Sequence, residues 1–162
     1  MADSKISNLS DVFALADTDE FPVVRSGETK KADVVYIKRI IPYFFFASIG
    51  DETTALTTGD SKYTFRIPEG CSLIDVRASL SVAGSASGTT TIDINKNGTS
   101  ILSTPLTIDA GEKTSETAAT PAAFSNVNFS DDDEITIDID AVSGGRTEAG
   151  LKLWFKLKGI DS

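Results

Sequence analysis

Alternation of apolar and polar residues with a period of two constrains the fold of this chain more than any other feature. From Pro42 onward, one stretch after another places an apolar residue at every second position, as in the run from Ile74 to Val82. Successive side chains of a β-strand point to opposite faces, so such a run buries one face and leaves the other in water. The pattern predicts half-buried antiparallel strands and almost no helix after Pro42.

About eight such strands follow one another, separated by turns rich in glycine, serine, threonine and aspartate. The dipeptide Asn97-Gly98 between two of them predicts a hairpin, because a type I′ turn needs positive φ at both central residues. This series of short strands favours an all-β fold, an antiparallel β-sandwich or jelly roll. The expected strands cover residues 63–67, 74–82, 91–95, 99–102, 106–108, 124–129, 135–139 and 151–157.

Residues 1–41 show no long strand pattern and are expected to form a separate N-terminal arm, with residues 42–162 as the β domain. The arm should contain a small hairpin around residues 25–28, with Gly27 in an unusual backbone conformation. A short helix should follow, capped by Asp33 and ended by Pro42. Because the arm is too small for a core of its own, we expect it to anchor the protein to a partner. The candidate anchoring residues are Ile6, Leu9, Phe13, Val23 and Val24.

The chemistry available to the chain argues against an enzyme. Histidine is absent from the 162 residues, which removes the commonest general base and every histidine-based metal site. The single cysteine, Cys71, is expected to be a small buried apolar residue rather than a nucleophile. A carbohydrate-active enzyme would need two carboxylates at a defined separation, and the sequence alone places no such pair. We therefore expect no catalytic residue and no cofactor.

Calcium is the one metal that the sequence suggests. The acidic run at residues 131–134 is followed by Asp138 and Asp140, and calcium prefers several oxygen ligands. The run lacks EF-hand spacing, and the two later aspartates alternate as residues on the wet face of a strand do. The favoured interpretation is a solvated turn followed by a solvated strand face, with no metal bound.

Charge and hydropathy limit the partners. The chain has 24 acidic and 15 basic residues and a net charge of −9, which opposes binding to a phosphate backbone, so nucleic acid is not an expected partner. The longest apolar run, residues 40–47, is too short to span a bilayer, and the N-terminus has no signal-peptide pattern. We expect a protein made in a cytoplasm, without a membrane partner.

Two strands carry aromatic residues where a solvated face is expected. The segment Tyr43–Ile49 is apolar on both strand faces, with Phe44 and Phe46 on one of them, and a strand of this kind must be covered twice. In the last strand, Trp154 alternates with Leu153 and Phe155 and shares its face with lysines. Phe44, Phe46 and Trp154 are therefore candidates for a subunit interface. The alternatives are that the helix of the arm covers the strand at residues 43–49, or that loops of the same chain cover these residues.

Several longer motifs occur in one order along the β domain. As an ordered set over roughly residues 63–158, they resemble a β-rich module that recurs in structural proteins of tailed bacteriophages. The arm, with KISNL at residues 5–9 and ALADTDEFPVV at 14–24, is similar to the leader of phage tail fibres and head appendages. The motifs of the β domain are FRIP at 65–68, DVRASL at 75–80, DINKNGTSILS at 93–103, LTIDAGEKTS at 106–115 and DDDEITIDID at 131–140.

The resemblance implies a virion structural protein, made in the bacterial host, that forms a homotrimer with the arm fixed to the particle. Long fibres with this leader usually continue into repeats, collagen-like tracts or heptads, and this chain has none. The expected function is therefore capsid decoration, as a cement or head-appendage protein bound to the major capsid protein or another virion protein. The alternative is a tail fibre or adaptor component, whose partner would be a host surface receptor.

Overall fold

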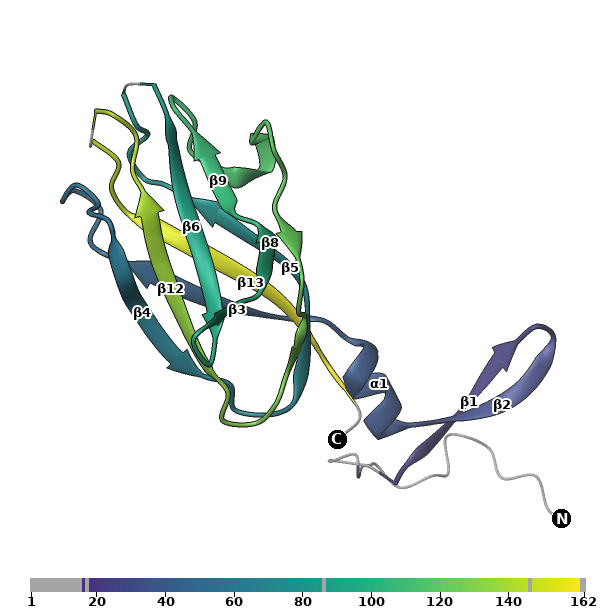
Figure 1. The fold of residues 1–162 in the computed structure, drawn as a ribbon. Coiled ribbons are helices and arrows are strands. Elements are labelled where there is room, and N and C mark those ends of the chain that lie inside the picture. Colours follow the sequence, from purple (N-terminus) through teal and green to yellow (C-terminus); the bar gives the residue numbers. More distant parts are fainter. Residues whose placement is uncertain (1–15, 17, 86, 146, 161–162) are drawn as a thin grey trace, which may run out of the picture. The chain divides into compact units, whose positions relative to one another are not determined.

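The computed structural model describes residues 16, 18–85, 87–145 and 147–160, and its chain forms two compact units (Figure 1). Their bounds are Met1–Ile41, called the arm here, and Pro42–Ser162, the β domain. The candidate anchors Ile6, Leu9 and Phe13 lie outside the described residues.

The arm consists of a hairpin and a short helix. Strand β1 (Glu20–Arg25) pairs with β2 (Glu28–Asp33), and helix α1 (Val34–Ile40) follows directly. The hairpin was expected, but its turn differs in one detail. Both Ser26 and Gly27 have positive φ, 56° and 79°, as a type I′ turn requires, so glycine does not carry the unusual conformation alone.

The helix begins where the sequence predicts, but not by the predicted means. Asp33 occupies the N-cap position, yet its side chain makes no capping hydrogen bond. The backbone N–H of Val34 instead donates to the backbone oxygen of Asp19, at 2.9 Å. The prediction that the Asp33 side chain caps the helix is therefore wrong, because the chain preceding β1 provides the acceptor for the first helical N–H.

The β domain is an antiparallel β-sandwich, as the alternation predicts. Apart from one 3-10 turn at Ser115–Thr117, the described part of this domain contains strands and loops. The strands are β3 (Tyr43–Ile49), β4 (Gly59–Arg66), β5 (Cys71–Ser79), β6 (Thr89–Lys96), β7 (Thr99–Ser100), β8 (Leu102–Thr104), β9 (Leu106–Asp109), β10 (Ala123–Phe124), β11 (Asn128–Phe129), β12 (Glu134–Ala141) and β13 (Leu151–Gly159).

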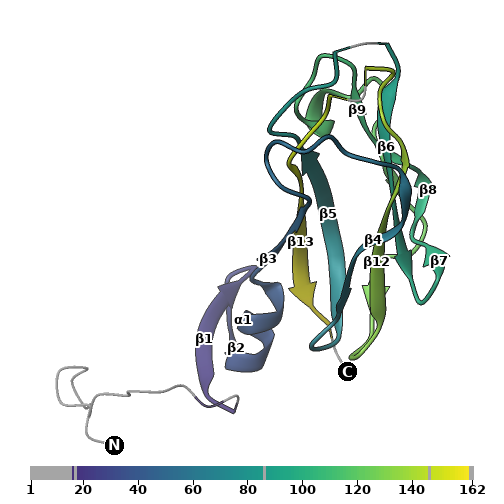
Figure 2. The same cartoon turned by 90° about the vertical axis from the view of Figure 1, so that its left-hand side faces the viewer.

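Strand order identifies the sandwich as a jelly roll. One sheet has the order β11-β5-β13-β3; the other has β4-β12-β6, with β7 and β9 both pairing with the outer edge of β6. The antiparallel pairs nest from the outside inward: β3 with β13, β4 with β12, β5 with β11, and β6 with β9. This nesting is the arrangement of a long hairpin rolled into two facing sheets, which Figure 2 shows nearly edge-on.

The core lies between the sheets and is almost entirely aliphatic and aromatic. Phe155 of β13, Phe45 of β3 and Phe65 of β4 form its aromatic part, with ring centroids 4.4 Å apart for Phe45 and Phe65 and 5.7 Å apart for Phe65 and Phe155. Cys71 is buried there as a free thiol, as expected. The residues with at most 1% of their surface exposed include Ile92, Ile94, Ile135, Ile137, Ile139, Leu151 and Leu153.

One expected strand is split. Residues 124–129 were expected to be continuous, but β10 pairs with β8 whereas β11 pairs with β5 of a different sheet. Between them, the N–H groups of Ser125 and Asn126 both donate to the carbonyl of Ile101. The chain changes partner here, which a local alternation pattern does not reveal.

The acidic run before β12 is also more than a solvated turn. The side chain of Asp133 is only 12% exposed; it accepts hydrogen bonds from the Ser130 N–H and the Asn97 side chain, each at 2.7 Å. Asn97 and Gly98 have φ of 49° and 78°, so the predicted type I′ turn is present. The hydrogen bond from the Ser130 N–H, above all, holds the pKa of Asp133 below its usual value. The interpretation of Asp133 as a solvated residue is wrong, because its carboxylate accepts hydrogen bonds from its own turn and from the Asn97-Gly98 turn.

A fully buried carboxylate holds the loops that follow β12. Glu148 is fully buried, and its Oε1 accepts from the backbone N–H of Ser143 and from the Thr90 hydroxyl, the latter at 3.1 Å. Its backbone oxygen accepts from Leu56 N–H at 2.7 Å, in the loop between β3 and β4. Burial would raise the pKa of Glu148, but these hydrogen bonds outweigh burial and hold the pKa below its usual value.

Replacement of Glu148 by alanine should lower the free energy of unfolding by about 1–3 kcal/mol, because two buried donors lose their acceptor. Since the folded pKa is depressed, the contribution is present above the ordinary carboxyl pKa and is lost as the pH falls. Urea unfolding at neutral and acidic pH measures both effects. Replacement of exposed Glu116 by alanine is the control and should cost less than about 1 kcal/mol. Equal losses for the two variants would contradict the role of Glu148.

Candidate functional site

The outer face of the sheet β11-β5-β13-β3 carries large aromatic residues. Trp154 of β13 lies opposite Phe46 of β3, with ring centroids 4.5 Å apart, and Lys156 lies opposite Phe44. Phe44, Phe46 and Trp154 are 65%, 40% and 47% exposed. The sequence grouped these three residues, and the structure places them together as one surface, which we call the aromatic strip.

Alternation within each strand creates the strip. Phe45 and Phe155 point inward to the core, so their neighbours Phe44, Phe46 and Trp154 must point outward. No loop among the described residues covers these three side chains, which leaves the alternative of burial under the chain's own loops without support.

Charged residues flank the aromatic strip on its β5 side. Arg77 lies opposite Trp154, and Asp75 lies opposite Lys156. Arg77 is fixed by ion pairs to Asp75 at 3.1 Å and to Glu116 at 2.9 Å. A groove of about 340 Å³ is lined by residues of β3, β5 and β13, namely Phe44, Asp75, Arg77, Trp154 and Lys156. The strip is therefore an apolar surface bordered by charges of both signs, on a protein of net charge −9.

Two residues of this surface, Arg77 and Ile74, were not predicted from the sequence. Arg77 occupies a solvated position of a predicted strand, so alternation alone gave no reason to single it out. Ile74 is 42% exposed because the pairing of β5 with β13 shifts register between Lys156 and Leu157, next to it. A register shift of this kind moves an apolar residue out of the buried series, and the consecutive apolar residues Leu73 and Ile74 are the one sign of it in the sequence of β5.

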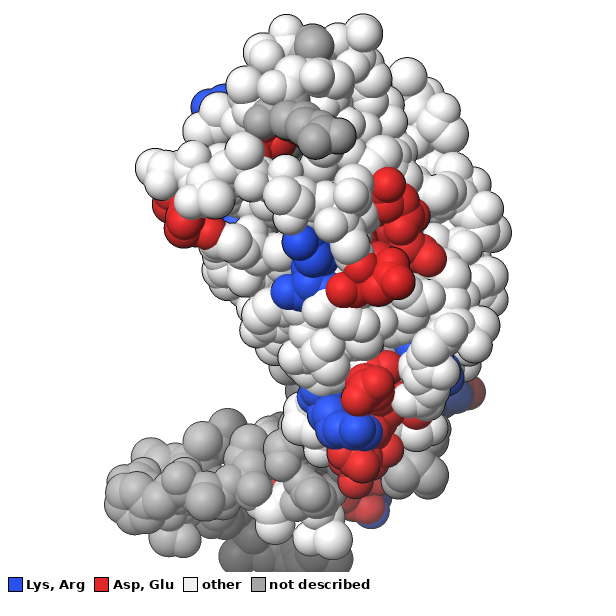
Figure 3. Space-filling view, turned by 60° about the vertical axis from the view of Figure 1, so that its left-hand side comes forward, with Lys and Arg blue, Asp and Glu red and all other residues white. Residues whose placement is uncertain are grey.

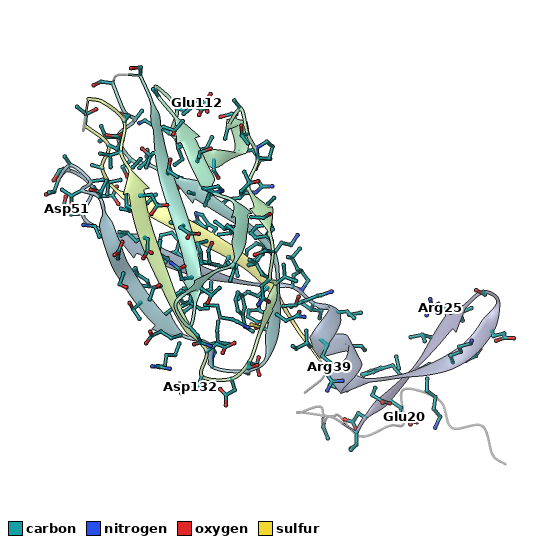
Figure 4. The ribbon with its side chains drawn as sticks, in the orientation of Figure 1. Glu20, Arg25, Arg39, Asp51, Glu112 and Asp132 are labelled. Carbon is teal, nitrogen blue, oxygen red and sulfur yellow. The ribbon has the colours of Figure 1, made fainter. Side chains whose placement is uncertain are left out.

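The arm carries the second exposed apolar surface. The candidate anchors Val23 and Val24 are 38% and 74% exposed, and Phe21, which the sequence did not single out, is 37% exposed. Ion pairs join Lys31 to Glu20 and Lys30 to Glu28 across and along the hairpin. Figure 4 labels Glu20 and Arg25 at the two ends of β1. A groove of about 620 Å³ is lined by β1, β2 and the helix residues Ile37 and Ile40.

The outer face of the opposite sheet is acidic, and Figure 3 shows acidic side chains gathered on that side of the β domain. The Asp138 carboxylate accepts from the Ser61 N–H at 2.6 Å and from Asn95 at 2.7 Å. Partial burial, followed by repulsion from Asp93 and Asp138, raises the pKa of Asp140. Among the described residues, no group of histidine, cysteine, aspartate and glutamate side chains is arranged to hold a metal ion.

The described part of the chain gives little support to a cysteine nucleophile or to a membrane-spanning helix. Burial raises the pKa of the Cys71 thiol, which disfavours the thiolate that a nucleophile requires. No described helix is long and apolar enough to cross a membrane.

Comparisons with known proteins identify no family for this chain. No family model matches it, and no curated protein matches it either. Among solved structures, the core of Drosophila NLP matches with 15% sequence identity and a TM-score of 0.39, over 75% of this chain and 100% of that chain. The crystal structure of that protein is described as giving insight into pentamer formation and histone binding. A likeness at this level carries no argument about the present chain.

Replacement of Asp140 by asparagine should stabilise the β domain at neutral pH. A folded pKa above the unfolded value means that the ionised carboxylate costs stability once the pH exceeds that folded pKa. The melting temperature at pH 7 should rise by about 1–2 °C, since exposed charge changes are usually worth within about 0.5 kcal/mol. The gain should vanish when the pH is low enough to protonate Asp140. The exposed Asp131→Asn variant removes the same charge elsewhere; an equal gain there would mean that net charge, not local repulsion, is responsible.

Proposed function

We propose that this protein is a structural component of a bacteriophage particle, a capsid decoration protein that forms a homotrimer and attaches to the major capsid protein through its arm. The ordered motifs of the β domain and the leader-like arm support the phage origin by resemblance. The protein acts by binding rather than by catalysis, and it needs no cofactor.

The exposed aromatic strip is the observation that carries this proposal. The β domain closes a full aliphatic core, so Phe44, Phe46 and Trp154 are not needed for that core. Adjacent exposed aromatic side chains on a sheet face are typical of surfaces that bind another protein. The function that this geometry supports best is association between copies of the chain.

Charge favours contact at the strip over contact elsewhere. Two copies of net charge −9 repel each other on average, but Lys152, Lys156 and Lys158 lie on the same face of β13 as Trp154. Lys152 is paired with Glu52, but Lys156 and Lys158 make this face less acidic than the chain as a whole. Repulsion between copies is therefore lower there, and copies should approach through the strip. Weak arm contacts from several subunits of one oligomer then add up to firm attachment on the particle.

Replacement of Phe44 by aspartate should convert the oligomer to a monomer, because an aspartate without a partner is costly in an apolar interface. Light scattering coupled to size-exclusion chromatography measures the mass. Val82→Asp is the matched control, since Val82 is 41% exposed but lies outside the strip. A wild-type protein that is already monomeric at micromolar concentration would contradict the proposed interface.

Removal of residues 1–41 should abolish attachment to the particle and leave the β domain folded, because the core residues lie almost entirely within residues 42–162. Intact and truncated protein would be added to particles that lack the protein, and the bound copies counted. Cooperative melting of the truncated form is the control for folding. Equal binding by the truncated form would show that the β domain is the anchor.

The number of copies on wild-type particles separates decoration from the tail alternative. Hundreds of copies per particle are expected of a shell protein. A few tens or fewer would place the protein in a tail fibre or adaptor.

A further inference from the structure

The hairpin of the arm has almost no cover. In β1 every residue is exposed, and in β2 only Ala32 is half-buried. Within the described residues, β1 and β2 form a sheet of two strands and no third strand pairs with either (Figure 2). A hairpin of two strands is at best marginally stable in water, so a third strand would stabilise this one considerably.

The register fixes which backbone groups point outward. The pair Arg25↔Glu28 flanks a turn of two residues, so it is a hydrogen-bonded pair, and such pairs alternate along an antiparallel ladder. The next hydrogen-bonded pairs are then Val23↔Lys30 and Phe21↔Ala32. The series predicts a bond between residues 19 and 34, and the N–H of Val34 does donate to the Asp19 oxygen at 2.9 Å. The N–H groups of Thr29, Lys31 and Asp33 therefore point away from β1.

The two free edges of the hairpin are not equivalent. On β1, the outward position opposite Lys31 is Pro22, which has no N–H to donate. Proline at such a position is a common way of preventing an edge strand from pairing further. On β2, the three outward positions all keep their N–H groups. The lysine side chains that would discourage pairing on this strand are joined to carboxylates, Lys31 to Glu20 and Lys30 to Glu28.

We propose that the outer edge of β2 binds an extended segment of the particle protein, which adds as a third strand to the hairpin. This inference rests on the proposed function, since it assigns the mode by which the arm attaches. The segment would exchange backbone hydrogen bonds with Thr29, Lys31 and Asp33. An apolar side chain opposite Ala32 would extend the apolar face that Phe21, Val23 and Ala32 share. Strand addition of this kind draws affinity from the main chain and specificity from alternate side chains.

The test compares Lys31→Pro with Lys31→Ala, in binding of the full chain to particles that lack the protein. Both variants lose the lysine side chain and its ion pair to Glu20, but only proline removes the outward N–H. Pro22, the cross-strand partner of Lys31, already occupies the equivalent position of β1, so the hairpin should tolerate proline at residue 31. We expect Lys31→Pro to bind at least about tenfold more weakly than Lys31→Ala.

Hydrogen exchange of the wild-type protein provides a second measurement, which needs no substitution. In the free protein the amides of Lys30 and Ala32 should exchange more slowly than those of Thr29, Lys31 and Asp33, which have no partner strand. On particles, the three outward amides should gain protection. Exchange at residues 30 and 32 of the Lys31→Pro variant also reports whether its hairpin is intact; if it is not, the wild-type exchange pattern decides.

The outcomes separate this inference from the proposed function. Equal binding by Lys31→Pro and Lys31→Ala, or unprotected outward amides on particles, would overturn strand addition. The proposed function would then still stand if removal of residues 1–41 abolishes binding. A loss of oligomer mass in Lys31→Pro would also overturn the inference, because β2 would then pair with a second copy of the chain. Binding without the arm would refute the anchoring role itself.

Discussion

The pairing of β3 with β13 is the interaction on which the rest of the structure depends. Seven residue pairs, from Tyr43↔Leu157 to Ile49↔Leu151, join the first strand of the β domain to its last. This pairing closes the jelly roll and places β13 between β3 and β5. A slip of one residue would turn Leu153 and Phe155 toward water and bring Trp154 and the lysines of β13 into the core. The burial of β13 and the exposure of the aromatic strip are thus two consequences of one register.

Two carboxylates, one half-buried and one fully buried, then hold the loops at the two ends of β12. Asp133, just before this strand, joins the turn at residues 130–133 to the Asn97-Gly98 hairpin. Glu148, in the loop after it, joins Thr90 and Ser143 through its carboxylate and Leu56 through its backbone oxygen. Asp133 accepts from the Ser130 N–H and the Asn97 amide, whereas only Oε1 of Glu148 accepts hydrogen bonds and its buried Oε2 has no partner among the described residues. Most of the exposed large apolar side chains then lie on the outer face of the sheet β11-β5-β13-β3 and on the arm, the two surfaces best suited to binding another protein.

Much of the fold could be predicted because it is encoded locally. Strand positions follow from alternation, and the Asn97-Gly98 turn and the arm hairpin follow from residues that accept positive φ. The candidate site could be predicted in part, since Phe44, Phe46 and Trp154 stand at outward positions of two apolar strands. Arg77 and Ile74 could not be found in this way. The first needs a neighbour from β13 to become part of a surface, and the second is exposed by a register shift that only the pairing of β5 with β13 creates.

The sequence by itself therefore determined the fold class, the division near Pro42 and the direction in which most strand residues point, since these depend on period-two geometry and on local backbone preferences. Tertiary structure decided which strands are neighbours, and so which outward residues meet. Residues 124–129 divide between two sheets, and the Asp133 carboxylate accepts a hydrogen bond from Asn97 of a distant turn. Trp154 comes to lie between Phe46 and Arg77. Pairing between distant strands depends on the combined burial of many side chains, and no single segment carries that information.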